Sequence, residues 1–129
     1  MDEVQGLRRE EAVTHEEIGK LEAGPDLDLL MAEKIMGWFG AGLKAAEVGV
    51  LWCPSVQIAA AWEVMGKVRA RLNVSVIIEI GRIKPEVCEV TFYDAYKGYH
   101  TLKGKEFVPV EAPTTSLAIC RAALKAVGA

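Results

Sequence analysis

Five basic side chains are the residues of this sequence best suited to contact a ligand. They follow or lie between predicted strands in the second half of the chain: Arg82, Lys84, Lys97, Lys103 and Lys105. Guanidinium and ammonium groups bind phosphate oxygens, so these residues are typical of a weak nucleic-acid-binding surface. The three lysines near His100 are equally typical of a solvated hairpin whose charges protect an edge strand. The sequence leaves both interpretations open.

No grouping typical of an enzyme active site occurs in the sequence. It contains no G-x-S-x-G, no H-E-x-x-H, no phosphate-binding loop and no dinucleotide-binding loop. His15 and His100 are its only histidines, and no metal-ligand spacing includes them. We therefore predict that the protein is not an enzyme, that no residue is catalytic, and that it uses no metal and no cofactor.

The cysteines and the apolar segments indicate a protein of the cytoplasm. Cys53, Cys88 and Cys120 are odd in number and far apart, which favours free, buried thiols over a disulfide framework. No apolar run approaches the roughly 20 residues of a membrane span. The acidic N-terminus does not resemble a secretory signal. We predict a cytoplasmic location and no membrane association.

The charges divide the chain into two parts. Residues 1–28 hold nine acidic and three basic side chains, a net charge of −6, and residues 29–129 carry +3. Few large apolar side chains occur before Gly24-Pro25, a pair typical of a boundary. We predict an acidic, partly helical N-terminal extension at 1–25 and one folded domain at 26–129.

A helix between Trp52 and Asn73 is expected to organise that domain. Its largest apolar side chains recur every three or four residues and predict one buried face: Ile58, Trp62, Met65, Val68 and Leu72. Ser55 is expected to cap the start and Asn73 to stop the end. With Trp62 buried, Trp62→Ala would be severely destabilising.

The remaining pattern predicts an α+β fold. A short amphipathic helix capped by Asp26 or Asp28 should have an apolar face from Leu27 to Trp38, and Gly37, Gly40 and Gly42 should end it. Alternating residues predict antiparallel strands at 74–80 and 87–93, with shorter extended segments at 99–102 and 106–110. A closing helix should be capped by Thr114, Thr115 or Ser116 and end at Gly128. This order predicts an antiparallel sheet of about three to four strands packed with helices, an α-β-α sandwich-like arrangement.

The aromatic residues around the unassigned segment 39–53 allow two interpretations. Trp38 and Trp52 either line a pocket together with Tyr93, Tyr96 and Tyr99, or close the core over the central helix. Cys88 and Cys120 fall on the apolar stripes of a strand and a helix and are expected to be buried.

Three segments, in order, resemble the phage ABA sandwich domain family. They are 32–38 (AEKIMGW), 58–64 (IAAAWEV) and 112–124 with its alanine-rich run, and together they cover roughly residues 28–127. The resemblance implies a small phage or prophage protein with a sheet sandwiched between helices, and no known reaction. The order of helix, strands and helix is also similar to double-stranded-RNA-binding domains, but the start of the closing helix, residues 112–116, lacks the lysines that such domains use there.

These features together predict an accessory protein that works by protein interaction. The expected partner is another protein or a second copy of this chain, joined through sheet edges or helix faces. The alternative function is weak nucleic-acid binding by the five basic residues named above.

Overall fold

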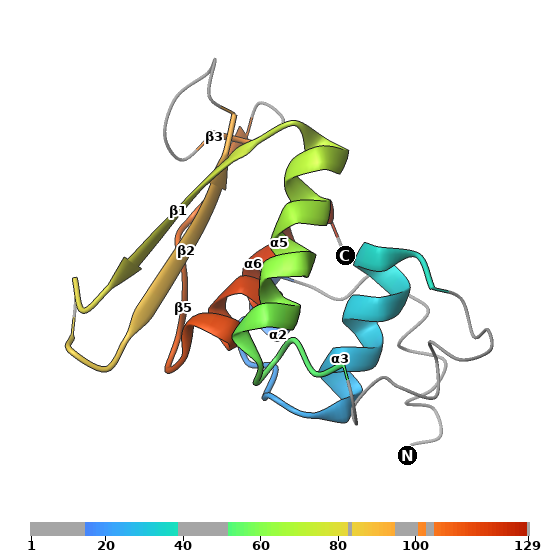
Figure 1. The fold of residues 1–129 in the computed structure, drawn as a ribbon. Coiled ribbons are helices and arrows are strands. Elements are labelled where there is room, and N and C mark those ends of the chain that lie inside the picture. The colour runs from blue at the N-terminus through green and yellow to red at the C-terminus, as the bar shows by residue number, and fades with distance from the viewer. Residues whose placement is uncertain (1–14, 39–51, 83, 95–100, 103–104, 129) are drawn as a thin grey trace.

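Figure 1 shows antiparallel strands on one side of the molecule and helices beside them. The structure, a computed structural model, describes residues 15–38, 52–82, 84–94, 101–102 and 105–128. Within these ranges the chain has an α+β fold with an antiparallel sheet packed with helices, which confirms the predicted fold class.

The main sheet has three antiparallel strands in the order β1-β2-β5. Their bounds are Ser75–Ile80 for β1, Cys88–Tyr93 for β2 and Val110–Ala112 for β5. Ile78 lies opposite Val90, which in turn lies opposite Val110, so one row of β-branched side chains crosses the sheet. Successive side chains of a strand point to opposite faces, so this row defines the face that meets the core. Val90 is fully buried there.

A separate two-stranded hairpin follows β2. It consists of β3, Thr101–Leu102, and β4, Lys105–Glu106. The predicted strand at 106–110 is therefore wrong as a single element, because β4 ends at Glu106 and β5 begins at Val110. Pro109 has no N–H to donate to a sheet, and the strand that pairs with β2 begins directly after it.

Helix α6, Thr115–Val127, is the element that joins the sheet to the other helices. The side chain of Thr114 accepts a hydrogen bond from the N–H of Leu117 at 3.2 Å, and Gly128 ends the helix with a φ of 83°. Both ends agree with the sequence prediction. Its many alanines allow close packing, and α6 packs against β2, β5 and α5. Burial consequently extends around nearly the whole helix.

Helix α5, Ile58–Leu72, buries a different face from the one predicted. The side chains that lie inside are Ala60, Ala61, Val64, Met65 and Val68. Ile58 is 50% exposed and Trp62 is 54% exposed, so the prediction that they form the inner wall is wrong. At 100° per residue, the buried face is rotated by roughly 70° from the predicted stripe. Close contact with α6 favours the small side chains, so the large ones turn outward.

The start of α5 differs from the sequence prediction, and its end agrees with it. Gln57, not Ser55, occupies the N-cap position, and no side chain caps that end. Ser55 is buried and its hydroxyl oxygen accepts a hydrogen bond from the N–H of Gly24 at 3.0 Å. Asn73 ends α5 in the left-handed conformation, with a φ of 55°, as predicted.

Helix α3, Pro25–Leu30, continues directly into a π-helical turn, η1, Met31–Met36. Gly24 occupies the N-cap position of α3, so the predicted caps Asp26 and Asp28 are wrong. Asp28 is instead buried within the helix. Gly37 ends η1 with a φ of 75°, as predicted.

The last part of the predicted N-terminal extension contacts the helices. The short helix α2, His15–Ile18, places Ile18 fully inside the core, and Arg121 of α6 donates to the carbonyl oxygen of Leu21. The division of the chain into 1–25 and 26–129 stays a prediction.

Candidate functional site

The predicted basic residues do not form one surface in the described part of the chain. Arg82 and Lys84 lie in the turn between β1 and β2. Lys105 lies in the β3–β4 hairpin, at the other end of β2 (Figure 1). A six-residue strand is about 20 Å long, so the two positions are separated by about that distance. Lys97 and Lys103 lie outside the described residues.

Arg82 is held by carboxylates of the sheet. Its Nε and Nη2 atoms donate to the two carboxylate oxygens of Glu89 at 2.8 and 3.1 Å, and Glu79 lies 3.4 Å from Nε. The hydrogen bond that Arg82 donates to Glu89 raises the pKa of Arg82. Glu89 is buried and lies directly opposite Glu79 on one side and Glu111 on the other. The charge of Arg82 therefore offsets a row of three carboxylates, and its attraction for a phosphate is correspondingly weaker.

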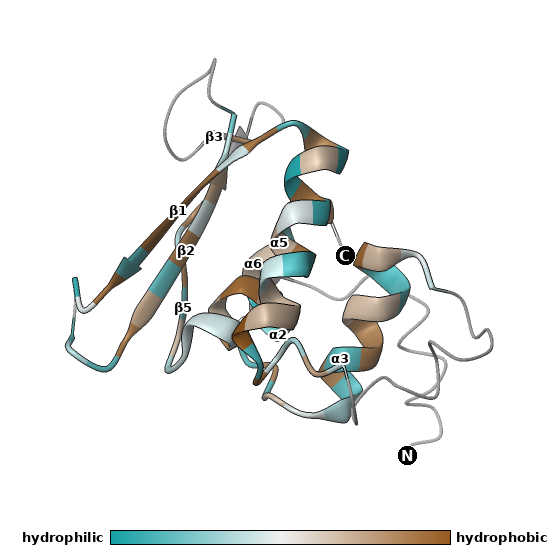
Figure 2. Ribbon diagram, viewed as in Figure 1, coloured by the Kyte–Doolittle hydropathy of each residue, from teal (hydrophilic) through white to brown (hydrophobic). Residues whose placement is uncertain are grey.

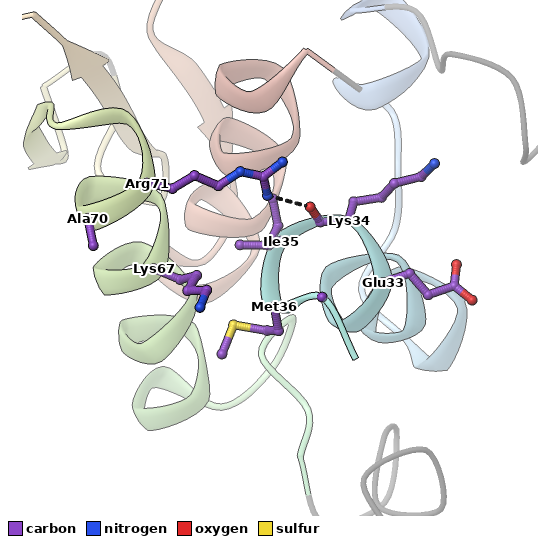
Figure 3. A pocket seen from close by; sticks show the side chains of 8 residues that line it. Glu33, Lys34, Ile35, Met36, Lys67, Ala70 and Arg71 are labelled. Atoms are coloured by element: carbon purple, nitrogen blue, oxygen red, sulfur yellow. Dashed lines mark hydrogen bonds between the residues drawn. The ribbon is translucent and has the colours of Figure 1, made fainter. Parts of the chain in front are cut away.

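A groove of about 740 Å³ lies between η1 and the C-terminal half of α5. Its walls are Glu33, Lys34, Ile35, Met36, Gly37, Lys67, Ala70 and Arg71. Figure 3 shows that the side chains of Glu33 and Lys34 point away from α5. The charged groups facing the space between the helices are consequently those of Lys67 and Arg71.

Arg71 joins the two walls of this groove. Its Nη1 atom donates to the carbonyl oxygen of Lys34 at 2.8 Å (Figure 3). The last carbonyls of a helix have no partner within the helix, and at this end the N–H groups of Gly37 and Trp38 both donate to Ala32. Arg71 therefore satisfies a carbonyl that the helix leaves open. The groove has cations and apolar walls, a set of groups that can hold an anion.

Sequence reasoning missed this groove, although one signal was available. Lys67 and Arg71 are four residues apart on α5 and so must share a face. Their position near the helix C-terminus, where cations are favourable, accounts for them without a ligand. Only the packing of η1 beside α5 makes them the wall of a groove.

Trp38 and Trp52 lie together, which both of the predicted interpretations require. Their ring centroids are 4.7 Å apart and Trp52 is buried. The Nε1 atom of Trp52 donates to Glu63 at 2.7 Å, which fixes the ring against α5. Tyr93 is half-buried at the end of β2. Tyr96 and Tyr99 lie outside the described residues, so the alternative of a pocket with these tyrosines stays a prediction.

The N-terminal half of α5 presents exposed apolar side chains. Ile58 and Trp62 are four residues apart and at least half exposed, and Val56 just before the helix is also exposed. On the same side further along lies the exposed cation Arg69. We call Val56, Ile58, Trp62 and Arg69 the outer face of α5. An exposed indole beside other apolar groups is typical of a contact surface.

The three cysteines are buried thiols outside any disulfide, as predicted. Burial, and to a smaller extent the charge of Asp28, raises the pKa of the Cys120 thiol. A neutral, buried thiol is a poor nucleophile and a poor metal ligand. Among the described residues, no three cysteine, histidine or carboxylate side chains come together as a metal site. No helix in the described ranges is both long and apolar enough to cross a membrane.

The comparison with known proteins identifies a family. No curated protein and no solved structure matches the chain. Residues 29–124, about three quarters of the 129, match the phage ABA sandwich domain. The match includes α5, the strands of the main sheet and most of α6. The chain therefore belongs to the phage ABA sandwich domain family.

Proposed function

We propose that this phage protein is an accessory protein that binds another protein, of the phage or of its host, and that it catalyses no reaction. The observation that supports the proposal is the half-exposed Trp62 on the outer face of α5. Its neighbour Ile58 extends the apolar area by one helical turn. Tryptophan is enriched among the residues that contribute most to protein–protein binding.

The side chains on the outer face of α5 indicate which groups its partner should present. Trp62 and Ile58 require an apolar pocket or ridge, and Arg69 beyond them requires a carboxylate. Glu63 already accepts a hydrogen bond from Trp52, so its charge contributes little to the contact with a partner. We therefore expect the partner to present an apolar patch bordered by acidic side chains, since electrostatic complementarity fixes the orientation of such a contact.

Affinity purification of the tagged full-length chain from bacterial cells that carry the phage tests this proposal. We expect one protein to be retained in near-stoichiometric amount by the wild type. Trp62→Ala should weaken its binding at least tenfold. Glu86→Ala, an exposed change in the turn between β1 and β2, is the control and should have no effect. Equal recovery with wild type and Trp62→Ala, or no recovered protein, would contradict the proposal.

The alternative function, weak nucleic-acid binding, is supported by a different set of residues from those predicted. The groove cations Lys67 and Arg71 are closer together than Arg82 is to Lys105. In a gel shift at low salt, the double change of Lys67 and Arg71 to Gln should abolish retardation, and Lys84→Gln should not. Retardation should also disappear with added salt. If the wild type retards neither DNA nor RNA, this alternative is wrong.

A further inference from the structure

We propose that strand β1 pairs with β1 of a second copy of the chain, which would give a continuous six-stranded antiparallel sheet. This surface differs from the outer face of α5, so the inference goes beyond the proposed function and does not depend on it. It rests on the open edge of β1, on the composition of that edge and on its self-complementarity about a two-fold axis.

One edge of β1 is open in the described part of the chain, where β1 pairs only with β2. The N–H of Gly81 donates to the carbonyl of Val87 at 2.9 Å, so residue 81 directs its backbone groups toward β2. In an antiparallel pair, hydrogen-bonded positions alternate along the strand. Residues 79, 77 and 75 therefore also face β2. The N–H and C=O groups of Val76, Ile78 and Ile80 consequently point to the open side.

This edge lacks the devices by which proteins prevent strand pairing. Natural edge strands are short, bulged, or interrupted by lysine or proline. β1 has six residues in unbroken register with β2, contains no proline, and carries one charge, on Glu79. Figure 2 shows it as mostly brown, that is, apolar. Ile80 is 66% exposed. The opposite edge strand, β5, has only three residues.

Two-fold symmetry restricts how two copies of β1 can pair. Residues directly opposite each other in an antiparallel pair point to the same face. The two-fold axis must therefore place one residue of β1 directly opposite the same residue of the other copy. Pairing along the full length of β1 then requires the axis to lie beside one of its two central residues, Ile77 or Ile78. The first places Glu79 opposite Ser75 of the other copy, and the second places it opposite Ile77.

Either register is complementary in charge and in polarity. No two like charges face each other, because Glu79 is the only charged side chain of β1. The exposed Ile80 gains an apolar neighbour in both cases, Val74 or Val76 of the other copy. The open backbone groups of Val76, Ile78 and Ile80 gain hydrogen-bond partners in the same step. A second copy of the chain is therefore the occupant that this edge fits.

The molecular mass in solution tests the proposal. Sedimentation of the full-length wild type at micromolar concentration should give twice the chain mass of 14.0 kDa. Ile77→Lys places a charge close to the axis on the face away from α6, and it should give the chain mass. Val108→Lys, the same chemical change at an exposed position outside β1, is the control and should remain a dimer. A wild type that stays monomeric up to about 100 μM would overturn the proposal.

Disulfide cross-linking distinguishes this dimer from any other. Opposed Cα atoms on the axis would be about 4.5 or 5.5 Å apart, both within the range that a disulfide can bridge. Either Ile77→Cys or Ile78→Cys, depending on the register, should form a covalent dimer on mild oxidation, and the control Val108→Cys should not. If neither variant cross-links, the proposal is wrong even if the wild type is dimeric. Trp62→Ala should remain dimeric, so that loss of a captured partner and loss of self-association are separate outcomes.

Discussion

The Oδ1 atom of Asp28 accepts a hydrogen bond from the backbone N–H of Ser55 at 2.8 Å, with both residues buried. The hydroxyl oxygen of Ser55 in turn accepts from the N–H of Gly24. The beginning of α3 is thereby tied to the turn that precedes α5. These two contacts fix the relative position of the helices that form the groove and the outer face of α5.

Removing this carboxylate should destabilise the fold. Asp28→Ala would leave the N–H of Ser55 buried without a partner, which costs about 1–3 kcal/mol of the free energy of unfolding. Asp28→Asn keeps an acceptor at the same position and should lose less. Urea denaturation followed by circular dichroism measures both. Equal losses for the two variants would show that the hydrogen bond is not the cause.

Stability at alkaline pH should depend on Cys120. Its raised pKa means that the folded thiol keeps its proton where the unfolded thiol, with an ordinary value of 9.0, loses it. Above pH 9 the folded state therefore binds more protons, and its stability falls as the pH rises. Between pH 8 and 10 this group should remove about 1.4 kcal/mol.

The matched comparison for this effect is Cys120→Ala, which cannot ionise. The difference in free energy of unfolding between the wild type and Cys120→Ala should shrink by that amount from pH 8 to 10. Urea titrations with a reductant present at both pH values measure it. A difference that stays constant with pH would contradict the prediction.

Arg121 should hold the segment around Leu21 on the body of the protein. Its Nε and Nη2 atoms donate to the carbonyl of Leu21 at 2.9 and 2.6 Å, and Nη1 donates to the carbonyl of Glu111 at 3.0 Å. Burial lowers the pKa of Arg121, so these bonds must compensate for the lost hydration. Arg121→Met should let the segment open, and cleavage by trypsin after Lys20 should accelerate about tenfold or more. Arg69→Met on α5 is the control, and a rate unchanged by Arg121→Met would rule out the anchor.

Trp62 should contribute little to stability although it is one of the largest side chains of α5. Because the ring is half exposed, Trp62→Ala should cost less than about 1 kcal/mol. Met65, nearly one helical turn further along and buried, should cost about 2–5 kcal/mol when changed to Ala. Thermal denaturation of the two variants gives the comparison. A loss for Trp62→Ala as large as that for Met65→Ala would place the indole inside the core in solution.

The C-terminal ends of the helices and the start of α6 could be predicted from the sequence because they depend on local chemistry. Gly37, Asn73 and Gly128 adopt the left-handed conformation that few other residues tolerate, and Thr114 has a hydroxyl in reach of the next amides. The alternation along β1 and β2 likewise predicted their antiparallel pairing. These features need only neighbours close in the chain.

The buried side of α5 and the partner of each charge could not be predicted, because distant segments determine them. The alanines of α5 and α6 have little hydrophobic signal, yet they allow the two helices to pack closely and turn Trp62 outward. Nothing in the sequence distinguishes the cation Arg82 from the cation Lys84 as a candidate to bind a ligand. The register of β2, however, places Glu89 where it can bind the Arg82 guanidinium. The groove exists because η1 lies beside Lys67 and Arg71. The sequence by itself indicated the family, through the resemblance of three of its segments, and it determined the fold class and the helix C-termini, through periodicity and local backbone preference. Only the tertiary structure decided which surfaces remain open for a partner, because that depends on which faces the packing has already used.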